Sequence, residues 1–288
     1  MPLDTTSYAL PVARTVADLR AAVADWRKQG LRVALVPTMG ALHAGHLSLV
    51  DLGLTRADRV IVSIFVNPSQ FAPHEDFSAY PRTEAADAEK LTGKAHLIFA
   101  PSAQEIYPSG FATTVTVSGV TAPLEGEFRP THFAGVATIV AKLILQAMPD
   151  VALFGEKDWQ QLQVITRMVA DLNIPVEIMG GAIMREADGL AMSSRNVYLS
   201  PAERQIAGQL NIILRDAATR VASGTPIEEA LNDARKRILA AGFNTIDYLE
   251  VRNATTLEAF VSGRPDAPAR ILVAAKLGRT RLIDNMPV

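Results

Sequence analysis

The feature that most constrains the fold is a regular alternation of short apolar runs with amphipathic stretches over the first 183 residues. The apolar runs are continuous and rich in Val and Ile, as in strands covered on both faces. They occupy residues 31–38, 59–67, 96–101, 113–119, 151–156 and 175–180. Helical patterns lie among them, at residues 16–29, 46–57, 83–93, 133–148 and 158–173. This order predicts an α/β fold, a Rossmann-like parallel sheet with helices on both faces, in which small ligands bind beyond the carboxyl ends of the strands.

The pattern changes after residue 183. Two helices are predicted, at residues 200–224 and 226–242, and three strands follow, at residues 245–253, 269–278 and 279–286. We therefore expect a domain of residues 1–183 and a smaller C-terminal α+β domain of residues 184–288. Ser200, Pro201 and Glu203 form the pattern typical of a helix N-terminus, so we interpret them as structural rather than catalytic.

Composition narrows the classes of function. The formal net charge is −2, so the protein as a whole would not attract nucleic acid or an anionic membrane, and any anion site must be local. The chain has no cysteine, which excludes disulfides and thiolate metal sites and fits a reducing compartment. Residues 1–16 lack the basic and apolar pattern of a secretion signal, and no uncharged stretch reaches the roughly 18 residues that a membrane span needs. We expect a cytoplasmic protein.

Two of the five histidines stand at one turn, between the first predicted strand and the helix that follows it. Gly40 and Gly45 would let the backbone approach a ligand closely there. Unpaired N–H groups at the start of a helix favour a phosphate. His43 and His46 lie on the same side of one helical turn, and each imidazole can donate a hydrogen bond to a phosphoryl oxygen, more strongly when protonated. The glycine spacing resembles that of a P-loop, but the Lys and the Ser or Thr that end a P-loop are absent.

Other interpretations of the histidine pair stay open at this point. A zinc site would need a third ligand, and neither the HExxH spacing nor a cysteine is present. Two ordinary structural histidines are also compatible with the sequence. A dinucleotide site is disfavoured because no GxGxxG follows any predicted strand. The residues favour a phosphate site over these alternatives.

Four motifs resemble those of a known family. TMGALHAGH, residues 38–46, resembles the HxGH signature of the nucleotidyl-transferring superfamily that includes class I aminoacyl-tRNA synthetases. With FVNPSQF (65–71), FGEKDWQQL (154–162) and READGLAMSSRN (185–196), in that order, the set is similar to pantothenate synthetases, the pantoate:β-alanine ligase family. The resemblance implies an enzyme that joins ATP and pantoate into pantoyl adenylate and pyrophosphate. The amine of β-alanine then attacks the acyl group to give pantothenate and AMP.

The resemblance also implies roles for individual residues. It assigns catalysis to His43, His46, Lys157, Ser193, Ser194 and Arg195. It assigns ATP binding to these six and to Met39, Gly40, Ala41, Leu42, Ala44, Gly45, Gly155, Glu156, Asp158, Met184 and Met192. It places pantoate and β-alanine against Met39, Asn67, Gln70 and Gln161, with Phe71 as an apolar wall. Because residues 193–195 lie at the edge of the second domain, we expect that domain to close over the site as a lid.

Some assignments remain alternatives. Arg129 in EFRPTHF either pairs with an anion or caps a helix. Asp87 in TEAADAEK lies on what reads mainly as a solvated helix face, with a water-mediated contact to Mg²⁺ as the alternative. Mg²⁺ is expected because it screens triphosphate charge, although the metal ligands are unknown and no protein cage is visible in the sequence.

The resemblance implies a homodimer, to which VTVSG, residues 115–119, would contribute an edge. Two other functions stay open. One is an enzyme that transfers a nucleotide to a phosphorylated acceptor, and the other is a nucleotide-binding regulator without catalysis.

Overall fold

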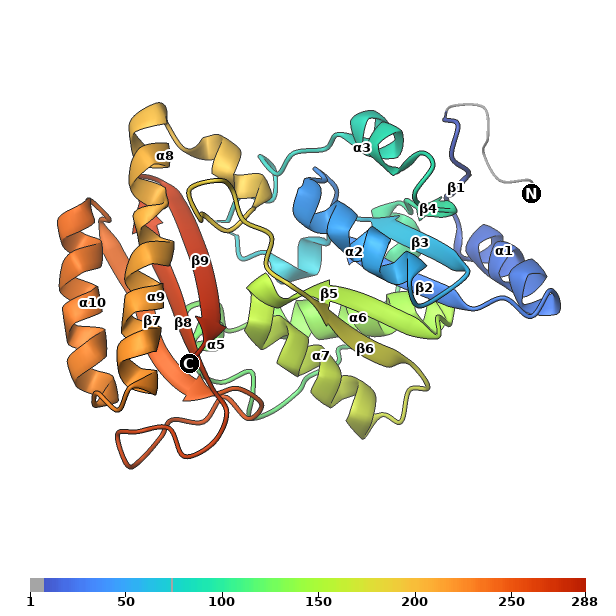
Figure 1. The fold of residues 1–288 in the computed structure, drawn as a ribbon. Helices are drawn as coiled ribbons and strands as arrows, with labels where there is room; N and C mark the ends of the chain where they lie inside the picture. The colour runs from blue at the N-terminus through green and yellow to red at the C-terminus, as the bar shows by residue number, and fades with distance from the viewer. Residues whose placement is uncertain (1–7, 74) are drawn as a thin grey trace.

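A six-stranded parallel sheet and a separate three-stranded antiparallel sheet organise the chain (Figure 1). The computed structural model describes residues 8–73 and 75–288. Residues 1–7, part of the segment in which no secretion signal was expected, lie outside the described residues. The strand order in the parallel sheet is β1-β4-β3-β2-β5-β6. Its strands are β1 (Val12–Ala13), β2 (Val33–Thr38), β3 (Arg59–Ile64), β4 (Leu97–Phe99), β5 (Val151–Gly155) and β6 (Glu177–Gly181).

Both faces of this sheet are covered, which explains why the strands read as continuous apolar runs. Successive side chains of a strand point to opposite faces. Leu35 accordingly lies in one core with the helices of residues 16–28, 132–147 and 159–171, whereas its neighbour Val36 lies in a second core with the helices of residues 44–54 and 84–91. The helices are α1 (Val16–Lys28), α2 (Ala44–Leu54), α3 (Glu84–Leu91), α4 (Ala103–Ile106), α5 (Glu125–Phe128), α6 (His132–Ala147) and α7 (Trp159–Asp171). The predicted parallel sheet with helices on both faces is confirmed.

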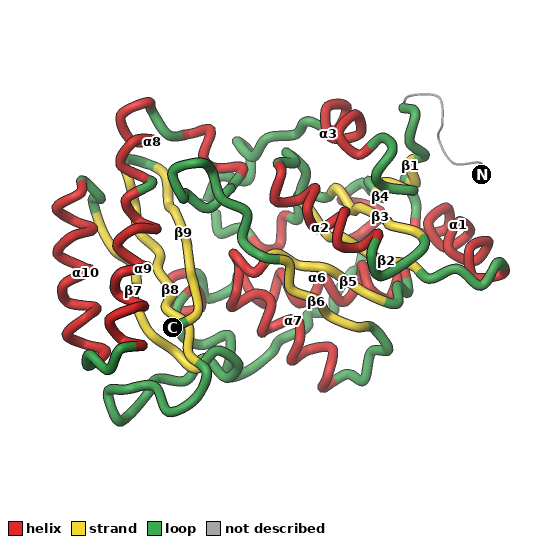
Figure 2. The backbone as a smooth tube through the Cα atoms, viewed as in Figure 1, coloured by secondary structure: helices red, strands yellow, loops and turns green. Residues whose placement is uncertain are grey.

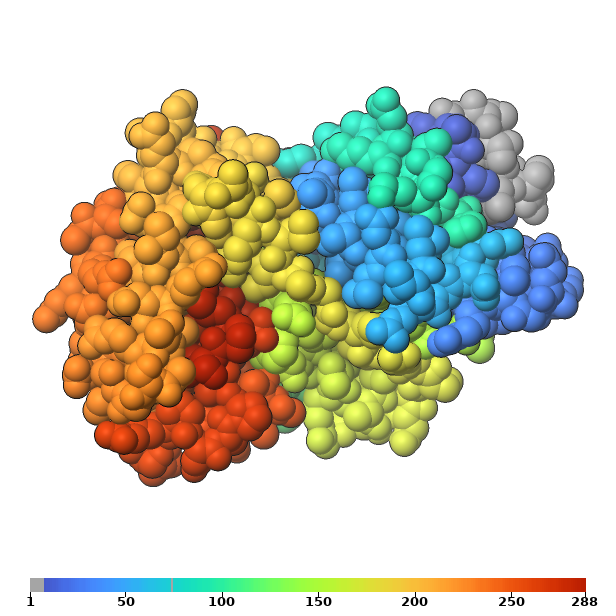
Figure 3. All heavy atoms as spheres, viewed as in Figure 1, coloured from blue at the N-terminus to red at the C-terminus, as the bar shows by residue number. Residues whose placement is uncertain are grey.

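The C-terminal part forms a second unit with its own core (Figure 2). Its helices are α8 (Pro201–Ala207), α9 (Gln209–Ala222) and α10 (Ile227–Ala241). Its antiparallel sheet has the order β7-β8-β9, with β7 (Thr245–Asn253), β8 (Ala269–Leu277) and β9 (Thr280–Pro287). In the space-filling view the yellow segment after β6 lies between this unit and the blue and green atoms of the first unit (Figure 3). The smaller C-terminal α+β unit is confirmed.

The structure corrects two predicted elements. Residues 113–119 form no strand, because the Val115 N–H bonds to the Thr138 hydroxyl of α6 at 2.9 Å instead of to a neighbouring strand. Their alternating pattern arises because Val115 and Val117 pack against the core. The predicted helix 200–224 is two helices that meet at Gly208, where a Cβ would lie 2.6 Å from an Asp188 carboxylate oxygen.

Two smaller points complete the fold. β1 was not predicted, since two residues at the sheet edge are too short to show a pattern. The predicted helix start at Ser200 is confirmed as a capping box, in which the Glu203 carboxylate accepts the Ser200 N–H at 2.8 Å. Within the described part of the chain, no helix combines the length and apolarity that a membrane crossing requires.

Candidate active site

A cavity of about 230 Å³ lies beyond the carboxyl ends of β2 and β5, where the fold predicts a ligand. All four sequence motifs contribute to its lining. The predicted residues that it brings together are Met39, His43, Gly45, His46, Asn67, Gln70, Phe71, Gly155, Lys157, Asp158, Gln161, Met184, Met192, Ser193, Ser194 and Arg195. Predicted residues that do not line it are Gly40, Ala41, Leu42, Ala44 and Glu156.

The two histidines use one ring nitrogen each to begin helix α2. His43 is the N-cap, and its Nδ1 accepts the Gly45 N–H at 3.1 Å. The Nδ1 of His46 accepts the His43 N–H at 3.3 Å. Because both Nδ1 atoms accept, the proton of each neutral ring is on Nε2. The ring centroids lie 4.1 Å apart, so the pair presents two neighbouring Nε2–H donors.

Burial keeps both rings neutral. It lowers the pKa of His43 to about 4, with a further contribution from the Lys157 charge. Burial also lowers the pKa of His46 to about 3, helped by His43 and Lys157. At neutral pH the site therefore offers uncharged N–H donors, and a bound polyanion would raise both pKa values.

The prediction of a main-chain amide cradle is wrong for the turn before α2. The Gly40 N–H bonds to the Thr38 hydroxyl at 3.1 Å. The N–H groups of Ala41 and Leu42 bond to the Asp87 carboxylate at 2.9 and 2.8 Å. The amides of residues 40–42 are thus occupied by Thr38 of β2 and Asp87 of α3, so these three N–H groups do not face a ligand.

Two arginines at the cavity are already paired with carboxylates of one loop. Arg129 forms a bidentate pair with Glu75, with both N–O distances at 2.7 Å, and it is also the C-cap of α5, so both of its predicted roles are present. Arg195 forms a bidentate pair with Asp76 at 3.0 and 2.9 Å. Burial opposes ionisation of both acids, but the arginines outweigh it and hold the pKa values of Glu75 and Asp76 below their usual range.

Besides Arg129 and Arg195, Lys157 is the one lysine or arginine among the described residues that line the cavity. Its ion pair is longer than those of the two arginines. It lies in a short 3-10 helix, η2 (Glu156–Asp158), directly after β5. Its Nζ is 4.0 Å from the Asp158 carboxylate. The backbone of η2 is held from β9, because Asn285 Nδ2 donates to the carbonyls of Glu156 and Lys157 at 3.0 and 2.8 Å. Lys157 therefore has a fixed backbone and a less strongly neutralised ammonium group.

The serines lie on the segment that joins the two units. Ser193 caps the short helix η3 (Ser194–Tyr198), and its hydroxyl accepts the Arg195 N–H at 3.3 Å. The Ser194 hydroxyl is 3.3 Å from the Tyr80 hydroxyl of the first unit. Both serines border the cavity. The hydroxyls and guanidinium of this motif thus reach the same cavity as the histidines.

The amide side chains of Asn67, Gln70 and Gln161 also line the cavity, and we call them the amide wall. Asn67 Nδ2 donates to Gln70 Oε1 at 3.0 Å, and Gln70 Nε2 lies 3.2 Å from the Met39 sulfur. Gln161 borders the cavity, whereas Gln160 faces away and bonds to the carbonyls of residues 120 and 123. The wall combines donors and acceptors with apolar side chains, as a small hydroxy acid would require.

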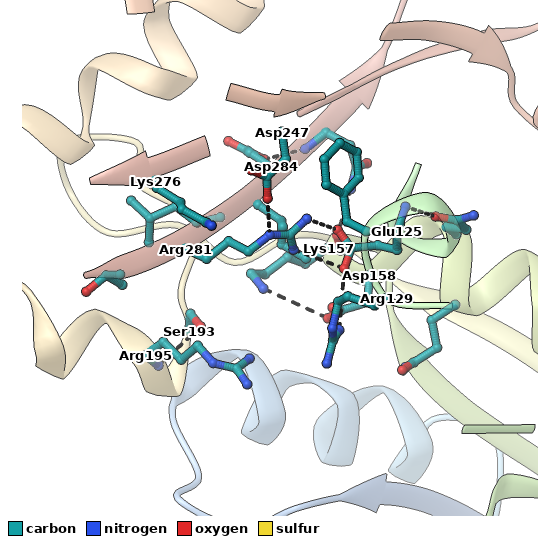
Figure 4. A pocket seen from close by; sticks show the side chains of 18 of the residues that line it. Glu125, Arg129, Lys157, Asp158, Ser193, Arg195, Asp247, Lys276, Arg281 and Asp284 are labelled. Carbon is teal, nitrogen blue, oxygen red and sulfur yellow. Dashed lines mark hydrogen bonds and ion pairs between the residues drawn. The ribbon is translucent and has the colours of Figure 1, made fainter. Parts of the chain in front are cut away.

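A second cavity, of about 570 Å³, adjoins the first between the two units (Figure 4). Both cavities are bordered by Arg129, His132, Lys157, Asp158, Gln161, Ser193 and Arg195. From β9, Arg281 pairs with Glu125 at 2.7 Å and with Asp247 at 2.7 Å. The second unit thus closes one side of the region in which the motif residues meet.

Among the polar residues that line the first cavity, His132 and Tyr80 lie outside the four motifs and were not predicted. His132 Nδ1 lies 2.9 Å from the Gln70 carbonyl, and burial lowers its pKa to about 4. Its signal was available, since His132 stands in the EFRPTHF stretch that drew attention to Arg129. Tyr80 had no such signal. Across residues 8–73 and 75–288, no three His, Cys, Asp or Glu side chains are grouped closely enough to hold a metal ion.

Comparisons with known proteins agree with the motifs. Residues 11–287 match the family model described as pantoate-beta-alanine ligase. The pantothenate synthetase of Caulobacter vibrioides is 58% identical over 279 residues, which cover 96% of this chain and 98% of that protein. That of Rhodospirillum rubrum is 55% identical over 281 residues, 97% of this chain and 99% of the relative.

Solved structures show the same relationship. Pantothenate synthetase from Thermus thermophilus superposes with a TM-score of 0.90 at 45% identity, covering 96% of this chain and 98% of that one. Pantoate-beta-alanine ligase from Francisella tularensis, complexed with beta-gamma ATP and beta-alanine, has a TM-score of 0.81 at 32% identity over 96% and 97% of the two chains. The chain therefore belongs to the pantoate–β-alanine ligase family.

Proposed function

We propose that this chain is an ATP-dependent ligase that condenses pantoate with β-alanine through a pantoyl-adenylate intermediate, releasing pyrophosphate and then AMP. The observation that carries the proposal is the meeting of the donors of all four motifs at one cavity. Its family membership supports the choice of substrates. The Francisella tularensis relative, complexed with beta-gamma ATP and beta-alanine, supports ATP and β-alanine in particular.

Adenylation joins a pantoate carboxylate oxygen to the α-phosphorus and breaks the bond to pyrophosphate, which leaves with the negative charge. The Nε2–H groups of His43 and His46 and the Lys157 ammonium group are fixed donors for that charge. Such preorganised donors lower the barrier because they need no rearrangement as charge develops. In the second step the β-alanine amine attacks the acyl carbon, and AMP leaves. Ser193, Ser194 and Arg195 complete the phosphate site from the second unit.

In this proposal, pantoate binds against the amide wall. Gln70 and Gln161 each offer a donor and an acceptor for the carboxylate and hydroxyls of pantoate, and Asn67 fixes Gln70 by the hydrogen bond at 3.0 Å. Met39 and Phe71 offer apolar surface for the gem-dimethyl group. The same wall orients the carboxylate toward the α-phosphorus.

Mg²⁺ fits this site as an ion that travels with ATP. Asp158 is the one carboxylate among the described residues that line the first cavity, and its side chain is 47% exposed. Asp87, the other candidate, is fully buried and occupied by backbone N–H groups. Triphosphate oxygens and water therefore supply most ligands, with Asp158 in reach, and the ion would screen the triphosphate charge.

Three further features belong to the proposal. Residues 184–288 act as a lid that excludes water from the acyl adenylate. The enzyme works in the cytoplasm. It is a homodimer, supported by residues 111–118, which form no helix or strand and pair with no strand of the described chain. Phe111 and Leu145 expose apolar surface, with whole-residue exposures of 37% and 56%.

Pyrophosphate release tests the reaction. Purified protein with ATP and Mg²⁺ releases pyrophosphate when pantoate is added, before any β-alanine, and free AMP appears once β-alanine follows. A product that keeps the nucleotide would favour transfer to a phosphorylated acceptor instead. ATP binding by calorimetry without turnover on any small acid would favour a nucleotide-binding regulator.

A further inference from the structure

Helix α3 lies behind the turn that carries the histidines, and Asp87 is its contact with that turn. The Asp87 side chain is 0% exposed. Its two oxygens accept the N–H groups of Ala41 at 2.9 Å and Leu42 at 2.8 Å, and the Thr83 hydroxyl donates to it at 3.1 Å. A buried carboxylate that accepts three hydrogen bonds has a defined orientation and is costly to leave unpaired.

The same turn is bound a second time from α3. Lys90 Nζ donates to the Leu42 carbonyl at 2.7 Å, so both polar backbone groups of Leu42 are held by one helix. The turn needs this support because its backbone is unusual. Gly40 has a φ of +83°, and Ala41 has a φ of +50°, a conformation that non-glycine residues rarely adopt. We call Asp87 and Lys90 together the α3 clamp.

The clamp acts on the residue next to the donors. Leu42 precedes His43, whose N–H bonds to the Nδ1 of His46 and whose ring accepts the Gly45 N–H. A shift of the turn therefore moves the His43 backbone and, through it, both imidazoles. We propose that the α3 clamp positions the Nε2–H donors of His43 and His46, and that Asp87 and Lys90 are positioning residues for adenylation. This inference rests on the proposed function.

Physical reasoning gives the size of the effect. A displacement of about 1 Å at a catalytic group costs on the order of 10²-fold in rate, so a partial loss of the clamp is expected to cost about tenfold. ATP also contacts the site through residues far from the turn, so its binding changes less. A loss in kcat with a nearly constant KM for ATP is the signature of an interaction that matters mainly in the transition state.

The test compares Asp87→Asn with Glu89→Gln, an exposed acid on the same helix. Pantoate-dependent pyrophosphate release should show a kcat about tenfold lower for Asp87→Asn, with KM for ATP within about threefold, and parental values for Glu89→Gln. Nitrogen NMR of the substrate-free protein should show protonated Nε2 and bare Nδ1 atoms in the parent, and a mixture of tautomers in Asp87→Asn. Parental kcat and parental histidine spectra in a folded Asp87→Asn protein would overturn the proposal.

A milder variant covers the case in which Asp87→Asn does not fold. Lys90→Met removes the hydrogen bond to the Leu42 carbonyl from the exposed side of α3, and kcat should fall about threefold or more. Parental kcat in Lys90→Met would then overturn the inference. If the parent enzyme itself releases no pyrophosphate with pantoate, the proposed function fails, whereas the NMR comparison still tests the clamp on its own.

Discussion

His43 has two separable tasks, one for each ring nitrogen, and a single substitution can remove one of them. Its Nδ1 caps helix α2 by accepting the Gly45 N–H at 3.1 Å, and its Nε2–H is the donor that faces the cavity. Asparagine is among the best N-cap residues and places an acceptor oxygen near the position of Nδ1, but it is too short to replace the Nε2–H. His43→Asn should therefore keep the cap and lose the catalytic donor. His43→Ala should lose both.

The expected magnitudes differ for stability and for rate. Losing an N-cap side chain costs about 1 kcal/mol, which corresponds to an unfolding temperature roughly 2–4 °C lower. This loss should appear in His43→Ala and be nearly absent in His43→Asn. Losing one preorganised donor to a developing oxyanion costs on the order of 10²-fold in rate, about 3 kcal/mol. Both variants should share that loss.

The assay pairs calorimetric unfolding with pantoate-dependent pyrophosphate release, measured on the same preparations of parent, His43→Asn and His43→Ala. If His43→Asn adenylates within about threefold of the parent, the Nε2–H is not the donor that the chemistry uses. If His43→Ala unfolds at the parental temperature, the cap assignment is wrong. The two results can fail independently, because the two nitrogens make different contacts.

Three other predictions concern the same cavity. Lys157→Ala should lower the adenylation rate about 10²-fold in a folded protein, and a parental single-turnover rate would refute its electrostatic role. Gln161→Ala should raise KM for pantoate more than KM for ATP, and equal increases would contradict its place on the amide wall. Burial lowers the pKa of His46 to about 3 and that of His132 to about 4 from an ordinary 6.5, so unfolding takes up protons below pH 6.5. Stability is full above that pH and falls toward pH 4, by up to about 1.4 kcal/mol per pH unit for each histidine. Urea midpoints should drop accordingly, and less steeply in His132→Phe.

Most of the parallel sheet could be predicted because strands that are buried on both faces appear in the sequence as continuous apolar runs. Most residues of a central strand are apolar, so runs such as residues 60–62 are visible without knowledge of their partners. The same reasoning failed at residues 113–119, which were predicted to form a strand. Their apolar side chains alternate because they pack along α6, and the Val115 N–H bonds to the Thr138 hydroxyl instead of to another strand. An alternating apolar pattern indicates which side chains are buried, but it does not indicate which partners the backbone N–H and C=O groups bind.

Within the site, the residues that donate were predictable and their partners were not. The sequence drew attention to Arg195 through a motif and to Arg129 through the EFRPTHF stretch. Their partners Asp76 and Glu75 are 119 and 54 positions away in the chain. Asp87 was predicted on a helix that reads as solvated, yet it is buried because the turn before α2 presents two N–H groups to it. Pairings of this kind depend on how the sheet brings distant segments together, which local pattern does not contain.

The contacts between the two units constrain how a lid can move. Asn285 of β9 is 2% exposed and bonds to the carbonyls of Glu156 and Lys157, and Arg270 lies 3.6 Å above the ring of Trp159. A rigid rotation of the whole C-terminal unit would break these contacts and leave a buried amide unpaired, which is costly unless water replaces the carbonyls. The segment from β6 to η3 is bound to the first unit by more accessible pairs, such as Arg195 with Asp76, whose side chains are 33% and 26% exposed. If residues 184–288 act as the proposed lid, opening should therefore cost less at this segment, and we expect Lys157 to keep its position while Ser193, Ser194 and Arg195 move.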